Sequence, residues 1–386
     1  MRTPSDPLAG RSRRYARRIW TRVLAAFVTA TLLLFAGSAD SSHSARAASR
    51  PDRLFAYYYI WFNATSWDRA KIDYPLLGRY SSDERDVMRK HVQWAKGAGI
   101  DGFIVSWKNT PVLNRRLERL AEVAAAQRFK LLVIYQGLDF SREPLPATRV
   151  ARDLDFFVSR YAGRNVFDVF GKPLVIWSGT PSFSRTELSE VAGPRRAKLL
   201  VLASERDVDG YRRVADLVDG NAYYWGSVNP TTYPNYPEKL AAMGAAVHAR
   251  DDLWIAPAAP GFDARRIGGR SVVARRDGAT LRTELDAATR SSPDAVGLIS
   301  WNEFSENTHI EPSRKYGSRY LEVLADVRGA RLPELRNFDS SEPAATGVNY
   351  GAPLLGGGVL FVLGGFLLLA RRARRRASSG MATRWD

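Results

Sequence analysis

The sequence predicts an α/β fold, a closed (β/α)8 barrel of the TIM type, with a flanking segment at each end. Apolar segments with the length of buried strands alternate with segments of helical periodicity between residues 54 and 327. Strands separated by helices run parallel, and eight such units fit a barrel of ~250 residues with insertions. An open, doubly wound sheet is the alternative. It is weakened because no glycine-rich phosphate-binding pattern follows the first strand.

The first four units have the composition of regular strands and helices. Their strands are short apolar runs rich in aromatic and β-branched residues, and their helices carry apolar residues three or four positions apart. Ser81 or Ser82 is placed to cap the first helix. The expected pairs of strand and helix are 54–62 with 83–96, 102–107 with 112–127, 130–136 with 147–161, and 173–178 with 185–191.

The second four units continue the same alternation. The last strand is an uninterrupted apolar run, which is typical of a parallel strand that is buried on both faces. We therefore expect one barrel domain over residues 51–335. The remaining pairs are 198–204 with 208–215, 217–225 with 237–248, 253–258 with 280–289, and 295–301 with 316–327.

Cysteine content and charge restrict the classes of function. The chain of 386 residues has a net charge of +17 and no cysteine, so disulfides and cysteine nucleophiles are excluded. Residues 1–50 carry +7, from nine arginines and two acidic residues, and residues 371–386 carry +5, from six arginines and one aspartate. Only +5 remains for the residues between them. Because the basic character belongs mainly to the flanks, we predict no nucleic-acid partner.

Both flanks have the features of membrane targeting. Residues 1–47 combine arginines, an apolar stretch and Ala45-Arg46-Ala47, the three parts of a cleavable secretory signal, with an uncleaved anchor as the alternative. A polar linker, 336–351, precedes the uncharged stretch 352–370, which is close to the ~20 residues that cross a bilayer. The arginine-rich tail 371–386 is expected in the cytoplasm. We predict a cell-membrane protein with one C-terminal transmembrane helix and an extracytoplasmic catalytic domain.

Aromatic residues gather at the expected carboxyl ends of the strands, where the active site of a barrel lies. Tyr59, Trp61, Trp107 and Tyr224 all stand near such an end. Aromatic rings present an apolar face that can stack on a sugar, and tyrosine adds a polar group for sugar hydroxyls. For any single ring, capping of the barrel interior is the alternative. The set as a whole favours a carbohydrate-binding site.

Two glutamates, Glu303 and Glu306, follow the eighth expected strand. Sugar hydrolysis needs two carboxyl groups in one site, so we predict that this pair is catalytic. The neighbouring Asn302 and Glu311 are expected to bind the substrate, with a helix cap as the alternative for Glu311. No histidines have metal-ligand spacing and no nucleophile elbow occurs. We therefore expect no metal, no cofactor and no Ser-His-Asp triad.

The segment Ser300–Pro312, SWNEFSENTHIEP, resembles the N-E-W-H-E-G-T-Q-I-E signature of glycoside hydrolase family 99, the endo-α-1,2-mannosidase family. Three further segments agree in the same order. Tyr58–Phe62 is similar to the aromatic first-strand motif of the family, Asp219–Trp225 to its sixth-strand segment, and Pro260–Arg266 to its P-G-Y-x-x-x-R loop. Phe304-Ser305 stands where the family has Trp-His between the two glutamates.

The resemblance implies a (β/α)8 barrel that hydrolyses α-mannosides with retention and without a covalent sugar–enzyme intermediate. Glu303 would deprotonate the substrate 2-hydroxyl, which attacks its own anomeric carbon, while Glu306 would protonate the leaving oxygen and then activate water. Tyr59, Trp107 and Tyr224 would line the sugar site. Two alternatives stay open: a glycosyltransferase-like enzyme of cell-envelope polysaccharide assembly, and a non-catalytic carbohydrate-binding surface protein.

Overall fold

The computed structural model describes residues 53–69 and 71–332. The segments predicted as signal (1–47), linker (336–351), transmembrane helix (352–370) and cytoplasmic tail (371–386) lie outside these residues. Within the two described ranges, none of the helices combines the length and the apolar character that crossing a bilayer needs.

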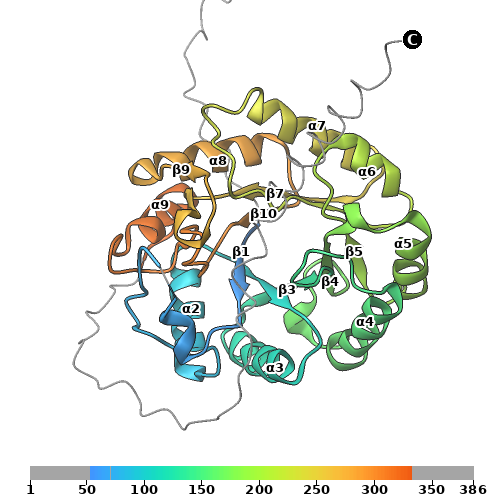
Figure 1. The fold of residues 1–386 in the computed structure, drawn as a ribbon, viewed down its shortest axis with the longest axis horizontal. Coiled ribbons are helices and arrows are strands. Elements are labelled where there is room, and N and C mark those ends of the chain that lie inside the picture. The colour runs from blue at the N-terminus through green and yellow to red at the C-terminus, as the bar shows by residue number, and fades with distance from the viewer. Residues whose placement is uncertain (1–52, 70, 333–386) are drawn as a thin grey trace, which may run out of the picture. The chain divides into compact units, whose positions relative to one another are not determined.

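The described chain forms a barrel of eight parallel strands, in the order β5-β4-β3-β2-β1-β10-β7-β6 (Figure 1). The edge strands β5 and β6 meet at a parallel bridge, where the Ala203 N–H donates to the Gly220 carbonyl and the Ala222 N–H donates to the Ala203 carbonyl, both at 2.9 Å. The sheet therefore closes on itself, which confirms the predicted barrel. The strands are β1 (Leu54–Tyr59), β2 (Gly102–Trp107), β3 (Lys130–Gln136), β4 (Leu174–Ser178), β5 (Leu200–Leu202), β6 (Gly220–Ala222), β7 (Leu253–Ala258) and β10 (Ala295–Leu298).

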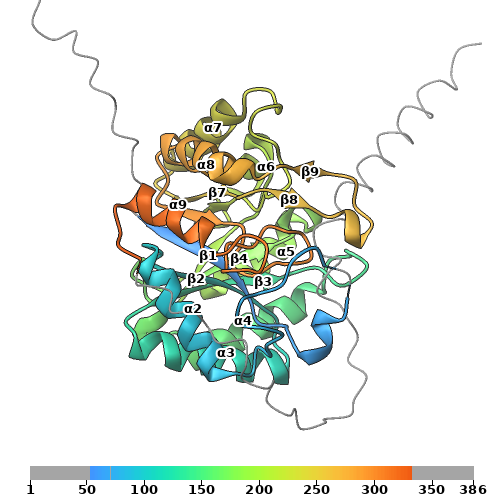
Figure 2. The ribbon, with the colours of Figure 1, turned by 90° about the vertical axis from the view of Figure 1, so that its left-hand side faces the viewer.

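Helices surround the strands, and Figure 2 shows α7 and α8 on the opposite side of the barrel from α2 and α3. Amphipathic sequences cause this arrangement, because each helix turns its apolar stripe toward the sheet. The α-helices are α2 (Arg85–Gly97), α3 (Pro111–Ala126), α4 (Ala147–Tyr161), α5 (Arg185–Ala192), α6 (Val208–Val214), α7 (Tyr236–His248), α8 (Ala279–Arg290) and α9 (Arg319–Arg328). Short 3-10 helices lie at Ala64–Trp67, Asn165–Phe167, Thr180–Ser182, Gly193–Arg195, Arg265–Ile267 and Arg276–Gly278.

The expected elements all form, and the differences lie at their ends. The predicted cap of α2 is wrong: its N-cap is Glu84, without a side-chain hydrogen bond. Ser82 is instead bonded to Phe62, whose N–H donates to the Ser82 hydroxyl at 3.1 Å. The aromatic strand expected over 54–62 ends at Tyr59. A short antiparallel hairpin, β8 (Phe262–Asp263) and β9 (Val272–Val273), was not predicted.

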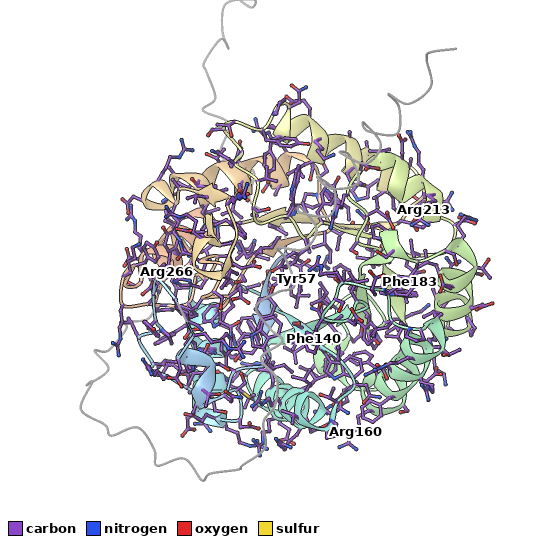
Figure 3. The ribbon with its side chains drawn as sticks, in the orientation of Figure 1. Tyr57, Phe140, Arg160, Phe183, Arg213 and Arg266 are labelled. Carbon is purple, nitrogen blue, oxygen red and sulfur yellow. The ribbon has the colours of Figure 1, made fainter. Side chains whose placement is uncertain are left out.

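Alternation along the strands divides the core into two layers. Phe55 and Tyr57 of β1 and Ile104 of β2 fill the interior of the barrel, and Figure 3 shows Tyr57 near its axis. Tyr58 and Trp107 stand at the alternate positions of these strands, and their side chains pack in the layer between the sheet and the helices. Successive side chains of a strand point to opposite faces. The position of a residue in this alternation, its parity, therefore decides whether its side chain can reach the barrel mouth.

Candidate active site

The segment after β10 forms a compact turn that is organised by Ser300. The Glu303 N–H donates to the Ser300 hydroxyl at 2.9 Å, and a hydrogen bond of 3.0 Å joins the hydroxyls of Ser300 and Thr308. The Thr308 N–H donates to the Glu303 carbonyl at 3.2 Å, and the Ser300 N–H donates to the Thr308 carbonyl at 2.9 Å. These bonds fix the backbone that carries both glutamates.

Arg275, between β9 and α8, holds the far end of this turn. Its Nη2 donates to the carbonyls of Asn307 and His309 at 2.8 and 2.7 Å. The guanidinium carbon lies 4.4 Å from the ring centroids of both Tyr316 and Tyr320. Charge-assisted hydrogen bonds and cation–π contacts of this kind are strong in a buried position, so the turn is rigidly supported.

Glu303 and Glu306 are both buried, with 4% and 3% of their surface exposed. The Ser305 N–H donates to Glu303 Oε1 at 2.9 Å, whereas Glu306 Oε2 has no hydrogen-bond partner among the described residues. Burial raises the pKa of Glu303 to about 7, against the hydrogen bond from Ser305 and the positive charge of Lys71. Burial, and after it the charge of Glu303, raises the pKa of Glu306 well above its usual value. Glu303 is therefore the first of the pair to lose its proton.

Tyr59 and Tyr224 stand beside the two glutamates. Their hydroxyl groups are hydrogen-bonded to each other. Burial raises the pKa of both tyrosines well above the usual value, and the charges of Glu303 and Glu306 add to this increase. Trp61 is half-buried and stacks on Tyr59, with ring centroids 4.2 Å apart. The carboxyl ends of β1, β6 and β10 thus bring these five predicted residues together.

Trp107 does not belong to this cluster, and its predicted contact with sugar is corrected. It is fully buried and points into the helical layer, where its ring centroid lies 5.7 Å from that of Phe157. Its Nε1 donates to Asn114 Oδ1 at 2.9 Å. At the end of β2, the side chain that points into the barrel is that of Ser106. Its hydroxyl accepts a hydrogen bond of 2.8 Å from Gln136.

The side chain of Asn302 is hydrogen-bonded within the protein, mainly to the backbone. Its Oδ1 accepts a bond of 2.8 Å from the Tyr59 N–H, and its Nδ2 donates to the Tyr59 carbonyl at 3.0 Å. Asn302 is fully buried. Asn302 therefore positions the end of β1, which differs from the predicted contact with substrate.

Glu311 is likewise engaged within the protein. The Tyr80 hydroxyl donates to Glu311 Oε2 at 2.9 Å, and His91 Nε2 lies 3.0 Å from Glu311 Oε1. His91 Nδ1 is in turn hydrogen-bonded to the Tyr58 hydroxyl at 2.9 Å. The carboxyl side chain has no exposed surface. This network supports β1 from the helical side, and it replaces both the sugar contact and the helix cap that the sequence suggested for Glu311.

Two cations near the glutamates were missed by the sequence analysis. Lys71 is half-buried and donates from Nζ to the Ser66 carbonyl at 2.6 Å, and its charge opposes the rise in the pKa of Glu303. Arg142 lies in the loop after β3, and its charge opposes the rise in the pKa of Glu306. Both residues sit in loops several positions away from a strand end, so no strand-end signal marks them.

Metal ligands do not gather in this part of the molecule. Across residues 53–69 and 71–332, no three histidine or acidic side chains are placed so that they could hold a metal ion.

Comparison with known proteins points to one family. No protein-family model matches the chain. A "Glycoprotein endo-alpha-1,2-mannosidase-like protein" of Danio rerio is 22% identical over 283 residues, which cover 66% of this chain and 63% of that protein. The mouse (Mus musculus) protein of the same name is 21% identical over 358 residues and covers 74% of this chain and 78% of its own length. The chain thus spans less than two thirds of the zebrafish relative.

Solved structures agree at the level of the fold. A structure of the GH99 endo-alpha-mannosidase of Bacteroides thetaiotaomicron has a TM-score of 0.64 at 21% sequence identity, over 72% of this chain and 96% of that chain. A "Glycoside hydrolase-like protein" has a TM-score of 0.57 at 15% identity, over 72% and 94% of the two chains. The relatives and the shared barrel confirm the predicted resemblance to glycoside hydrolase family 99.

Proposed function

From this resemblance to family 99, we propose that the protein is a retaining glycoside hydrolase that cleaves α-mannoside-type bonds in a polysaccharide or glycan. The observation that carries the proposal is the buried pair Glu303 and Glu306 beside the tyrosines Tyr59 and Tyr224. The relatives are named as endo-α-1,2-mannosidase-like proteins, and two carboxyl groups in one site are what glycoside hydrolysis requires.

The resemblance supplies the roles of the two carboxyl groups. Glu303 takes the proton of the substrate 2-hydroxyl, O2 forms a bond to the anomeric carbon, and the bond from that carbon to the leaving oxygen breaks. Glu306 donates its proton to the leaving oxygen. In the second step Glu306 takes a proton from water, the water oxygen bonds to the anomeric carbon, the bond from that carbon to O2 breaks, and Glu303 returns the proton to O2. Two inversions give net retention, and every proton is accounted for.

The electrostatics of the site favour Glu303 as the base and Glu306 as the acid over the reverse assignment. The first step needs an ionised Glu303 and a protonated Glu306. Burial brings the pKa of Glu303 to about 7. Once Glu303 is ionised, its charge keeps the proton on the buried Glu306. Two neighbouring carboxyl groups whose environments separate their pKa values are typical of an acid and a base in one site.

Glu306→Gln is the direct test of the proposed hydrolysis. Loss of a general acid–base group lowers the rate by about 10²–10⁴-fold, so we expect a loss of this size on an α-1,2-mannose oligosaccharide, with saccharide binding retained. Glu238→Gln is the matched control, since Glu238 is exposed on the first turn of α7. Proton NMR of the first product should show retained anomeric configuration. A wild-type protein that binds the oligosaccharide without cleaving it would support the non-catalytic alternative, and transfer to a sugar acceptor would support the glycosyltransferase.

We also propose that residues 1–47 direct secretion and that residues 352–370 anchor the domain to the cell membrane. The charge pattern of the two flanks supports this proposal. Membrane fractionation of the full chain and of a chain ending at residue 335 tests it, because only the full chain should sediment with membranes.

A further inference from the structure

Two arginines at the barrel mouth have no role in the proposed reaction. Arg142 lies in the loop between β3 and α4, and Arg206 lies in the segment between β5 and α6. In the closed order of the sheet, β3 and β5 each stand three strands from β10, in opposite directions. Both segments follow the carboxyl end of a strand, which is the end of the barrel at which the glutamates follow β10.

The loop that carries Arg142 is a tight turn. An antiparallel bridge joins Leu138 to Pro144, the Asp139 N–H donates to the Glu143 carbonyl at 2.8 Å, and the Arg142 N–H donates to the Asp139 carbonyl at 3.1 Å. Phe140 at the tip is 55% exposed, and Figure 3 labels it beside β3, below Tyr57 in the view. The turn follows the carboxyl end of β3, so Arg142 belongs to the same end of the barrel as the glutamates that follow β10.

One nitrogen of the Arg142 guanidinium is buried without a partner. This atom, Nη1, has no hydrogen bond among the described residues, and the same is true of Glu306 Oε2. The charges of Arg142 and Glu306 act on each other, yet the two side chains form no ion pair. A buried polar atom without a partner is costly, so Arg142 Nη1 and Glu306 Oε2 are both suited to contact with a ligand.

Arg206 increases the positive charge at this place. Its own neighbours in the sequence do not compensate it, since Glu205 pairs with Arg213 at 3.1 Å and Asp207 caps α6 through the Gly210 N–H at 2.7 Å. Burial, and after it the charge of Arg206, lowers the pKa of Arg142. Arg206 is exposed, and its positive charge adds to that of Arg142 in attracting an anion.

We infer that Arg142 and Arg206 bind a negatively charged group of the saccharide, a carboxylate or a phosphate, next to the sugar bond at Glu306. This inference rests on the proposed function and names its substrate class, an acidic glycan. Guanidinium groups bind both anions through paired hydrogen bonds. A protonated Glu306 does not repel such a group, so the arrangement is consistent with the acid role of Glu306.

Binding to the full chain with the Glu306→Gln change separates this inference from turnover. The ligands are α-1,2-mannobiose, the same disaccharide with a carboxylate at C6 of one sugar, and the same disaccharide with a phosphate at that position. Calorimetry should show at least one acidic form binding about 10-fold more tightly than the neutral form, as expected for charge-assisted hydrogen bonds. The advantage should shrink as salt is raised, and the two acidic ligands distinguish a carboxylate site from a phosphate site.

In the Glu306→Gln protein, a second substitution, Arg142→Gln or Arg206→Gln, should remove most of the preference for the acidic ligand. Arg160→Gln is the matched control, because Arg160 is exposed on α4 and pairs with Glu118. Equal affinity for neutral and acidic ligands, or no binding of any of them, overturns the inference. An undiminished preference in both arginine variants overturns it as well. Cleavage of the neutral mannobiose by the wild-type protein tests the hydrolase proposal separately, so the two can fail independently.

Discussion

Two buried glutamates that follow β10, Glu306 and Glu311, differ in the hydrogen bonds that the protein gives their carboxyl groups. Glu311 has both oxygens hydrogen-bonded, one to Tyr80 and the other to His91. Glu306 is equally buried, yet its Oε2 has no partner among the described residues. The contrast shows that burial alone does not identify a functional carboxyl group. A buried carboxyl group that the protein leaves without hydrogen bonds is the better candidate for contact with a ligand.

The unsatisfied group is tolerated because its surroundings are firmly held. A buried polar group without a partner costs about 1–3 kcal/mol. The Arg275 bonds to the Asn307 and His309 carbonyls and the Ser300 bonds inside the turn keep the segment from rearranging to relieve this cost. Rigid support of polar groups that the protein itself leaves unsatisfied is what a preorganised active site requires.

The largest expected effect is on catalysis, and it separates Glu303 from Glu311. Glu303→Gln should lower kcat by about 10²-fold or more, since it removes the group that accepts the 2-hydroxyl proton. Glu311→Gln keeps a hydrogen-bonding side chain in the network and should lower kcat by less than about 10-fold, since Glu311 acts only through the position of β1. Steady-state kinetics on an α-mannoside oligosaccharide measures both. Equal losses in the two variants would contradict the comparison.

The free energy of unfolding should show the reverse order, with the larger loss on substitution of Glu311. Glu311→Ala leaves Tyr80 and His91 without their buried partner, and a loss of about 3–5 kcal/mol in the free energy of unfolding is expected for a broken buried pair. Glu306→Gln removes a carboxyl group that has an unmet hydrogen bond, so stability should stay within about 1 kcal/mol of the wild type or increase. Urea unfolding followed by tryptophan fluorescence measures the two changes. A larger loss for Glu306→Gln than for Glu311→Ala would refute the assignment.

The pH profile tests the charge on Glu303. Its pKa is raised to about 7, so Glu303 is protonated below that pH and cannot accept the substrate proton. The value of kcat/KM should therefore rise with pH through about 7 and fall again at higher pH as Glu306 ionises. Lys71→Met removes a charge that lowers the pKa of Glu303 and should move the acid limb to higher pH. Lys96→Met, on the outer end of α2, should leave the limb in place.

The smallest expected effect concerns the rings. Trp61 is half-buried beside Tyr59, and Trp61→Ala should raise KM by about 5-fold through the loss of a stacking surface worth about 1 kcal/mol. Trp107→Phe, in the helical layer, should leave KM unchanged within the scatter of the assay. An equal rise in KM for both tryptophans would place Trp107 at the sugar after all.

The order of the elements could be predicted because it depends on local periodicity. The bounds of β2, β3, β7 and α4 follow from apolar runs and helical spacing with no need of long-range contacts. The cap of α2 was missed because Ser82 makes its bond to Phe62, a contact across the loop after β1. The hairpin β8–β9 was missed because strands of two residues carry no periodic signal.

Residues of the candidate site could be predicted only where they stand next to the end of a strand. Tyr59, Tyr224, Glu303 and Glu306 could be found because a barrel gathers the residues that follow its strands. Lys71 and Arg142 could not, since each reaches the site through the course of a loop. Trp107 stands at the correct end of a strand but on the wrong face, and an error of one residue in parity moves a side chain from the barrel mouth to the helical layer.

The alternation of strands and helices and the pair of glutamates after the last strand can be found in the sequence alone, because both are properties of neighbouring residues. Which buried carboxyl group is hydrogen-bonded, and which is left without a partner, depends on the three-dimensional fold. Tyr80, His91 and Arg142 come from elements far from Glu306 and Glu311 along the chain. Hydrogen bonds and charges act over a few ångströms in space, and the distance between these residues is set by the closure of the barrel.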